Sequence, residues 1–173
     1  LEDLFDHFDP KPIATASIAT VHRALLHDGR EVAVKVQHRG IDMIIRQDLD
    51  NAMVIAESIV EEDPKFDFRS ILREWCNETT KELDFVQEAY NTETVRRKLL
   101  CDTTVVTTVP KVIQTERIFP TTRVLVLEFI DGVKPTDRDA LARIGADNAK
   151  VLEAISVAFA RQIFVDGLFN ADP

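Results

Sequence analysis

Cysteine is scarce in this chain, and its scarcity argues against two kinds of site. Cys76 and Cys101 are the only two cysteines among 173 residues, and neither has a second cysteine or a histidine at the spacing of metal ligands. The sequence therefore predicts neither a disulfide framework nor a zinc site, and no metal site within the chain. Long apolar runs are missing as well, since none approaches the roughly twenty residues that cross a bilayer. Two of the first four residues, Glu2 and Asp3, are acidic, which is unlike a targeting signal, so we expect neither a membrane span nor a targeting signal in this sequence.

Positive charge is also in short supply. The chain has 21 lysines and arginines against 30 aspartates and glutamates, a formal net charge of −9, and the acidic residues are spread along it. This balance disfavours a surface that follows phosphates, so we expect no nucleic-acid partner. With 45% hydrophobic residues, the chain can fill one core, or one and a fraction. Because Leu1 is not an initiator methionine and the sequence stops just after an apolar stretch, we expect a piece of a longer protein.

The first half of the chain reads as two strands followed by helices. The β-compatible residues 18–26 and 31–37 flank Asp28-Gly29, a strong hairpin turn. Residues 41–60 show apolar spacing typical of a helix. A second helical pattern begins near Asp67, a plausible N-cap, and covers about thirty residues, as one long helix or two with a kink. We expect the aromatic residues of this region (Phe66, Phe68, Trp75 and Phe85) to pack in the core.

The second half returns to strands and then to helices. Residues 105–113 and 123–130 are β-rich and predict a second hairpin whose turn lies at 118–122. Asp131-Gly132 marks a hinge. Beyond it, residues 136–144 predict a short helix, and residues 148–165 predict an apolar helix that ends at Gly167. The order of strands, helices, strands, hinge and helices predicts an α+β fold.

The segment from Ala14 to Val21 has the spacing of a kinase phosphate loop, with alanine in each glycine position. Lys35 follows inside an apolar strand, where a kinase places the lysine that neutralises phosphate charge. Alanine keeps such a loop small but removes access to positive φ. The alternative is an ordinary hairpin with one exposed strand lysine.

Three carboxylates, on Glu82, Asp84 and Glu88, lie in the long helical pattern. A kinase-type site needs a helix glutamate to hold its lysine by charge-assisted hydrogen bonds. Glu88 is our choice of partner for Lys35, because its neighbours Val86 and Ala89 could face the sheet. The alternative is that all three carboxylates solvate the outer helix face.

Two further segments suggest nucleotide chemistry more weakly. Residues Glu128 to Ile130 lie where a chain leaving a sheet could offer backbone N–H and C=O groups to an adenine edge, or form an ordinary strand end. Asp172 follows the helix stop at Gly167, where a loop aspartate could orient a nucleophile or hold a metal ion.

Taken together, these segments resemble the UbiB/AarF family of atypical protein-kinase-like proteins. The resemblance rests on five motifs in order, which begin at Ala14, Val32, Glu82, Leu127 and Gly167. It implies a protein-kinase-like fold. Residues 1–130 would form the N-terminal lobe, with an antiparallel sheet and inserted helices, and residues 131–173 would begin a helical C-terminal lobe that is truncated at the catalytic-loop aspartate.

The resemblance also implies a role for each candidate residue. Lys35, Glu88 and Asp172 would be catalytic, and Glu82 with Asp84 would be the regulatory E-x-D motif, which in the family meets a K-x-G-Q segment that this sequence does not contain. Asn170 stands where the family usually has histidine. The cofactor-binding residues would be Ala14, Ala16, Ser17, Ala19, Val21, Ala33, Lys35, Glu128 and Ile130.

The function implied by the resemblance is an ATP-binding, atypical kinase or ATPase domain that supports ubiquinone or other prenyl-lipid metabolism. The cofactors would be ATP or ADP with Mg²⁺, held mostly by H-P-G-N and D-F-G residues beyond position 173, so the fragment alone should be inactive. Its partners would be a prenyl lipid or lipid-biosynthesis proteins, in a mitochondrion or plastid. Two alternatives stay open: a non-catalytic, pseudokinase-like scaffold that binds nucleotide or lipid, and a protein Ser/Thr kinase.

Overall fold

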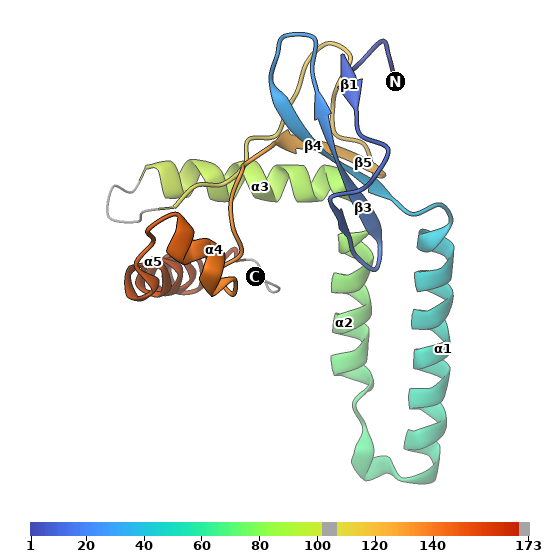
Figure 1. Cartoon of the computed structure of the whole chain (residues 1–173). Coiled ribbons are helices and arrows are strands. Elements are labelled where there is room, and N and C mark those ends of the chain that lie inside the picture. Colours follow the sequence, from blue (N-terminus) through green and yellow to red (C-terminus); the bar gives the residue numbers. More distant parts are fainter. Residues whose placement is uncertain (102–106, 170–173) are drawn as a thin grey trace.

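The computed structural model describes residues 1–101 and 107–169 (Figure 1). Strands from the N-terminal part of the chain and one later strand form a sheet, one helix packs on a face of it, and two helices project from it (Figure 1). The strands are β1 (His7–Phe8), β2 (Ala14–Thr15), β3 (Ala19–Leu25), β4 (Glu31–Gln37) and β5 (Val124–Glu128). The helices are α1 (Ile41–Glu62), α2 (Arg69–Glu82), α3 (Phe85–Leu100), α4 (Arg138–Arg143) and α5 (Asn148–Arg161), with a short 3-10 helix (Pro64–Phe66) and a π-helical turn (Gln162–Asp166).

The sheet is antiparallel throughout, with the order β1-β3-β4-β5, and β2 pairs with β3 beside this path. The predicted hairpin of β3 and β4 is confirmed, and its register places Val21 opposite Lys35. Gly29 supplies the positive φ of 84° in the turn, a conformation that costs glycine little because it has no Cβ.

Among the described residues, the predicted second hairpin is present only as an isolated antiparallel bridge. Strand β5 pairs with β4, and residues 107–113 belong to no strand; residues 105 and 106 of the predicted strand lie outside the described residues. The segment reaches the far edge of β5 through a single bridge, between Val112 and Leu127. Pro110 explains why a full ladder does not form there, because proline has no backbone N–H to donate.

The two faces of the sheet bury different clusters. One face packs against the N-terminal turn and the loop before β5, and its cluster consists of Phe5, Ala24, Leu26, Val32, Val34, Ile113, Ile118 and Val126. The other face packs against α3 through Ala19, Phe85, Ala89, Val112 and Leu125. Because antiparallel partners directly opposite each other share a face, Lys35 opposite Leu125 lies on the α3 side.

Helix α1 confirms the first predicted helix, and the longer pattern after it divides into α2 and α3. The division falls at Leu83 and Asp84, and the Asp84 carboxylate accepts the Val86 N–H at 2.9 Å as the N-cap of α3. Helices α1 and α2 lie side by side and project from one end of the sheet (Figure 1).

The prediction of an aromatic core holds for one residue only. Phe85 is fully buried, whereas Phe66, Phe68 and Trp75 are exposed. The three exposed rings belong to α2 and the short turn before it, in the pair of helices that leaves the sheet.

The C-terminal helices follow the prediction closely. Asp137 caps α4, Asp147 caps α5, and Gly167 ends the last helical turn with a φ of 66°. Leu99 of α3 packs against Ala158 of α5, so α3 contacts the sheet at its start and the C-terminal helices at its end. Within the described part of the chain, no helix is both long enough and apolar enough to cross a membrane.

Candidate functional site

The site is organised around an ion pair between the sheet and α3. Lys35 Nζ lies 2.7 Å from both carboxylate oxygens of Glu88, although the two residues are 53 positions apart. The side chains are 24% and 34% exposed, respectively. The structure thus brings together the two residues whose pairing the sequence predicted. Partial burial makes this contact stronger than an exposed pair, since water screens it less.

An aromatic ring completes the surroundings of the lysine. The Lys35 ammonium lies 4.7 Å from the centroid of the Phe85 ring, within the range of a cation–π contact. Phe85 is the first residue of α3 and stands one helical turn before Glu88. The start of α3 therefore supplies both a carboxylate and an aromatic face to the same ammonium group.

Small side chains lie beside Lys35 on the same face of the sheet. Val21 is directly opposite it on β3, and Ala33 is two residues away along β4. Successive side chains of a strand alternate between faces, so Val21, Ala33 and Lys35 form one surface. A cation next to a flat patch of small apolar groups suits a ligand with an aromatic part and a phosphate part.

The alanine-rich loop is a tight connection between β2 and β3. The Ala16 N–H donates to the Ala19 carbonyl at 2.9 Å, and Ala14 pairs with Val21. Among the described residues only glycines adopt positive φ, so the loop closes without the left-handed conformations that glycine would allow. Ala14, Ala16 and Ser17 are exposed.

Two contacts modify the predicted roles within this loop. Ala19 is 1% exposed and packs in the cluster of Phe85, so only its backbone could contact a ligand. A ring nitrogen of His38, at the end of β4, lies 3.0 Å from the Ala16 carbonyl oxygen, and the His38 N–H donates to the Ile18 carbonyl. Two contacts of His38 therefore connect the loop to the end of the strand that carries Lys35.

The predicted hinge follows β5 at the edge of the same surface. Leu125 is opposite Lys35 and Leu127 is opposite Ala33, so residues 128–130 continue past the small side chains. The Glu128 N–H donates to the Lys111 carbonyl at 2.8 Å, and its carboxylate accepts the Lys111 N–H at 3.2 Å. Both the side chain and the N–H of Glu128 are therefore engaged with Lys111, which leaves its carbonyl as the group of Glu128 that could still accept a hydrogen bond from a ligand.

The residues of the predicted E-x-D motif lie at the junction of α2 and α3. Glu82 is the exposed last residue of α2. Asp84 is half-buried, and its carboxylate caps α3. The structure therefore gives Asp84 a local structural contact, next to the residues that meet Lys35.

Asp172, the predicted catalytic aspartate, and Asn170 lie outside the described residues. Among residues 1–101 and 107–169, histidine, cysteine, aspartate and glutamate side chains do not gather in groups of three or more that could hold a metal ion.

Sequence reasoning missed one buried residue near the pair. Gln37, two positions after Lys35 on β4, is 8% exposed and donates its side-chain N–H to the Leu83 carbonyl at 3.1 Å. A glutamine at a strand position that alternation assigns to the α3 side is the signal that could have identified it.

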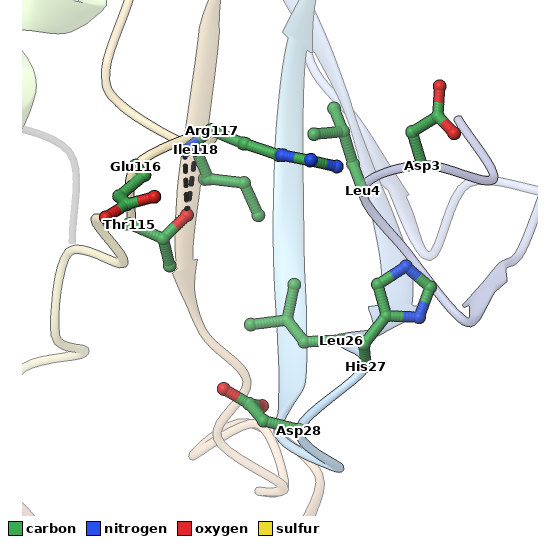
Figure 2. Close-up of a pocket in the computed structure, with 9 residues that line it drawn as sticks. All are labelled: Asp3, Leu4, Leu26, His27, Asp28, Thr115, Glu116, Arg117 and Ile118. Carbon is green, nitrogen blue, oxygen red and sulfur yellow. Dashed lines mark hydrogen bonds between the residues drawn. The ribbon is translucent and has the colours of Figure 1, made fainter.

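Two cavities lie away from this surface. One, of about 350 Å³, is on the opposite side of the sheet (Figure 2). The dashed lines there mark the Thr115 hydroxyl, which accepts the N–H groups of Arg117 and Ile118. The second, of about 450 Å³, lies where α3 meets the C-terminal helices, beside Lys98 and Arg161. Neither is lined by a predicted site residue; the first is lined by Asp3, Leu4, Leu26, His27, Asp28, Thr115, Glu116, Arg117 and Ile118.

Comparison with known proteins gives a consistent result. The model of the ABC1 atypical kinase-like domain matches residues 1–173. AarF domain-containing protein kinase 1 of Mus musculus is 34% identical over 173 residues, which cover 100% of this chain and 32% of that protein. The chloroplastic protein ACTIVITY OF BC1 COMPLEX KINASE 8 of Arabidopsis thaliana is 35% identical over 178 residues, which cover 100% of this chain and 23% of that protein. The chain thus spans about a third or less of the length of these curated relatives.

A solved structure is similar as well. The Mycobacterium tuberculosis protein Rv3197, solved in complex with erythromycin, matches with a TM-score of 0.71 and 30% sequence identity, over 94% of this chain and 40% of that chain.

The antiparallel sheet, the helix packed on one face and the lysine paired with its glutamate define a kinase-like fold. The chain belongs to the family of the ABC1 atypical kinase-like domain, and this assignment confirms the resemblance to UbiB/AarF proteins.

Proposed function

We propose that this chain binds ATP or ADP with Mg²⁺ as the nucleotide-binding part of an atypical kinase or ATPase. The observation that carries the proposal is the bidentate contact of Lys35 with Glu88, at 2.7 Å, on the face shared with Val21 and Ala33. Such a pair holds an ammonium group where a phosphate can approach it. In this proposal, Val21 and Ala33 contact the base, and Lys35 neutralises phosphate charge.

The remaining residues of the proposed pocket follow from their positions. Residues 14–19 would cover the phosphates with their backbone, and Glu128 and Ile130 would pair with the adenine edge. Mg²⁺, when bound, would supply positive charge that balances the charge of the phosphates. Asp172 would orient the hydroxyl or water that attacks the γ-phosphate. Catalysis of this kind consists mainly of positioning and charge stabilisation.

The proposed setting is ubiquinone or other prenyl-lipid metabolism in a mitochondrion or plastid. Its support is the resemblance of the chain to UbiB/AarF proteins, together with the word chloroplastic in the name of the Arabidopsis relative. Fractionation of cells that express the tagged full-length protein, followed by analysis of their quinone content after its removal, tests this part of the proposal. Unchanged quinones and a protein found outside both organelles would contradict it.

Calorimetric titration of the full-length protein with ATP and ADP, with and without Mg²⁺, tests the nucleotide site. We expect Lys35→Ala to weaken binding by about 10- to 100-fold, because a hydrogen bond to a charged group contributes about 1.5–3 kcal/mol. Lys65→Ala is the control, since Lys65 is an exposed lysine in the turn between α1 and α2. Equal affinity of wild type and Lys35→Ala would refute the proposed site.

Turnover measurements separate the alternatives. Release of phosphate from ATP that depends on Lys35 supports an ATPase. Binding without any release supports a scaffold that responds to nucleotide. Labelled phosphate that appears on added peptides, and is lost in Asp172→Asn, would instead support a protein Ser/Thr kinase.

A further inference from the structure

Gln37 is a buried polar side chain that the proposed nucleotide contacts leave unexplained. It is 8% exposed at the end of β4 and lies opposite Ala19. Residues two apart on a strand share a face and lie about 6.6 Å apart, so Gln37 is on the face of Lys35. A buried amide requires hydrogen bonds, and this one donates to the Leu83 carbonyl at 3.1 Å.

Leu83 occupies the corner between α2 and α3. It is the C-cap of α2 and is 6% exposed. Carbonyl groups at a helix end lack partners within the helix, and a buried one costs stability unless another group donates to it. Gln37 supplies that donor from the sheet. Two residues later, the Phe85 N–H donates to the Thr122 carbonyl at 3.3 Å, so β4 and the bend before β5 each contact this corner once.

We propose that Gln37 is a positioning residue, which fixes the start of α3 through Leu83 so that Glu88 meets Lys35. The proposed role assumes the nucleotide function of the Lys35–Glu88 pair. Strand β4 carries both Lys35 and Gln37, so one strand sets the position of the ammonium group and of the helix that brings its carboxylate.

The geometry of a helix explains why the corner needs such a bond. Each residue of an α-helix turns it by about 100° and advances it by 1.5 Å. A slip of α3 by one residue would therefore move the Glu88 carboxylate off the face that meets Lys35. Apolar contacts are not directional, so the packing of the Phe85 and Ala89 side chains does not by itself fix the register of α3, and hydrogen bonds at the corner must contribute. The hydrogen bond from Gln37 to the Leu83 carbonyl is directional and lies five residues before Glu88.

The reactivity of the Lys35 amine tests this role independently of nucleotide. Acetic anhydride acylates amines that are free of a carboxylate partner, and mass spectrometry measures the rate at Lys35. We expect Gln37→Leu to raise that rate about three- to fivefold, which corresponds to the loss of part of the ion pair, about 0.6–1 kcal/mol. In a Glu88→Gln background, Gln37→Leu should add nothing, because the partner is already lost.

Gln162→Leu is the matched control for the loss of a buried amide. Gln162 is also 8% exposed and also donates to a backbone carbonyl, that of Ala158, but within its own helical segment. We expect Gln162→Leu to leave the Lys35 rate at the wild-type value. A similar rise in both variants would mean a general loosening of the fold and would overturn the positioning role.

A second variant covers the case in which Gln37→Leu does not fold, as judged by circular dichroism. Gln37→Asn keeps the polarity but shortens the side chain by one methylene, so its amide is drawn away from Leu83. A raised Lys35 rate in this variant supports the role, and a wild-type rate overturns it.

Titration with ATP then separates this inference from the proposed function. If wild type binds ATP and needs Lys35, Gln37→Leu should weaken binding, with no further loss in the Lys35→Ala background. If wild type does not bind ATP, the proposed function fails, while the acylation rates still decide whether Gln37 positions Glu88. An unchanged Lys35 rate together with unchanged ATP affinity would overturn the role of Gln37.

Discussion

The contact between Lys35 and Glu88 should be measurable as a coupling free energy in the unfolding of the protein. The perturbations are Lys35→Met, Glu88→Gln and the double variant. Methionine retains much of the apolar stem of lysine, and glutamine retains the shape of glutamate, so each substitution removes mainly a charge. The cycle reports the part of the stability that requires both charges at once.

Two limits bracket the expected magnitude. Exposed ion pairs contribute about 0.2–1 kcal/mol, and the Coulomb energy of two unit charges 4 Å apart at an effective dielectric of 20 is about 4 kcal/mol before the cost of desolvation. With side chains 24% and 34% exposed and both carboxylate oxygens in contact, the pair falls between these limits. We expect a coupling of about 1–2 kcal/mol.

Urea unfolding followed by circular dichroism provides the assay. With a slope of about 2 kcal/mol per M, this coupling corresponds to about 0.5–1 M in the transition midpoint. The pair of Arg23 and Glu31 is the matched control, because it is also bidentate, at 2.6 and 2.8 Å, but its side chains are 48% and 47% exposed. A coupling for Lys35 and Glu88 no larger than that of the control would refute the argument from burial.

Three further predictions concern local structure. Asp84→Ala should lower the free energy of unfolding by about 1 kcal/mol, whereas Asp84→Asn should retain most of it, since asparagine also caps helices; thermal unfolding checks both. Gly40→Ala should cost about 1–2 kcal/mol because Gly40 begins α1 with a φ of 77°, and Gly132→Ala, with negative φ and open space around it, should be nearly neutral in the same assay. The side-chain and backbone hydrogen bonds of Arg69 lower the pKa of Asp67 from 3.8 to about 2. Their stabilising effect is therefore present above pH 3.8 and is lost as the pH falls through 2. An NMR titration should show the low pKa of Asp67, and Arg69→Ala should return that pKa toward 3.8.

The sequence predicted the parts of the fold that local patterns determine. The turn at Asp28-Gly29 identified the hairpin of β3 and β4, and apolar spacing identified α1. Lys35 could be placed because it follows the alanine-rich loop at the spacing of a kinase phosphate loop and its lysine. The spacing of Asp84 and Gln87, an acidic cap followed three residues later by glutamine, was a further signal for the start of α3 that we did not use.

The errors have a common physical origin in tertiary structure. Residues 107–113 contain β-forming residues and lie along the edge of β5 opposite β4, but their pairing is limited to the bridge of Val112 with Leu127, since Pro110 has no N–H to extend it. The two-residue strands β1 and β2 are too short to have a periodic signal. Gln37 escaped notice because its hydrogen-bond partner, Leu83, is 46 residues away.

Lys35 and Glu88 are 53 positions apart, and helices α1 and α2 lie between them in the sequence. The arrangement of these two helices explains how the pair keeps its geometry. Helices α1 and α2 are packed side by side (Figure 1), so the chain leaves the sheet at the end of β4 and returns close to the same place. The return point is fixed by the bond from Gln37 to Leu83, and the departure point is held by Asp42, which lies 3.6 Å from Arg123 at the start of β5. Because both ends of the insertion are anchored to the sheet, its length has little influence on where α3 begins. Substitutions at the end of α1 and α2 that is distant from the sheet should therefore be tolerated. Substitutions should change the contact of Lys35 with Glu88 only when they disturb the Gln37–Leu83 or the Asp42–Arg123 contact.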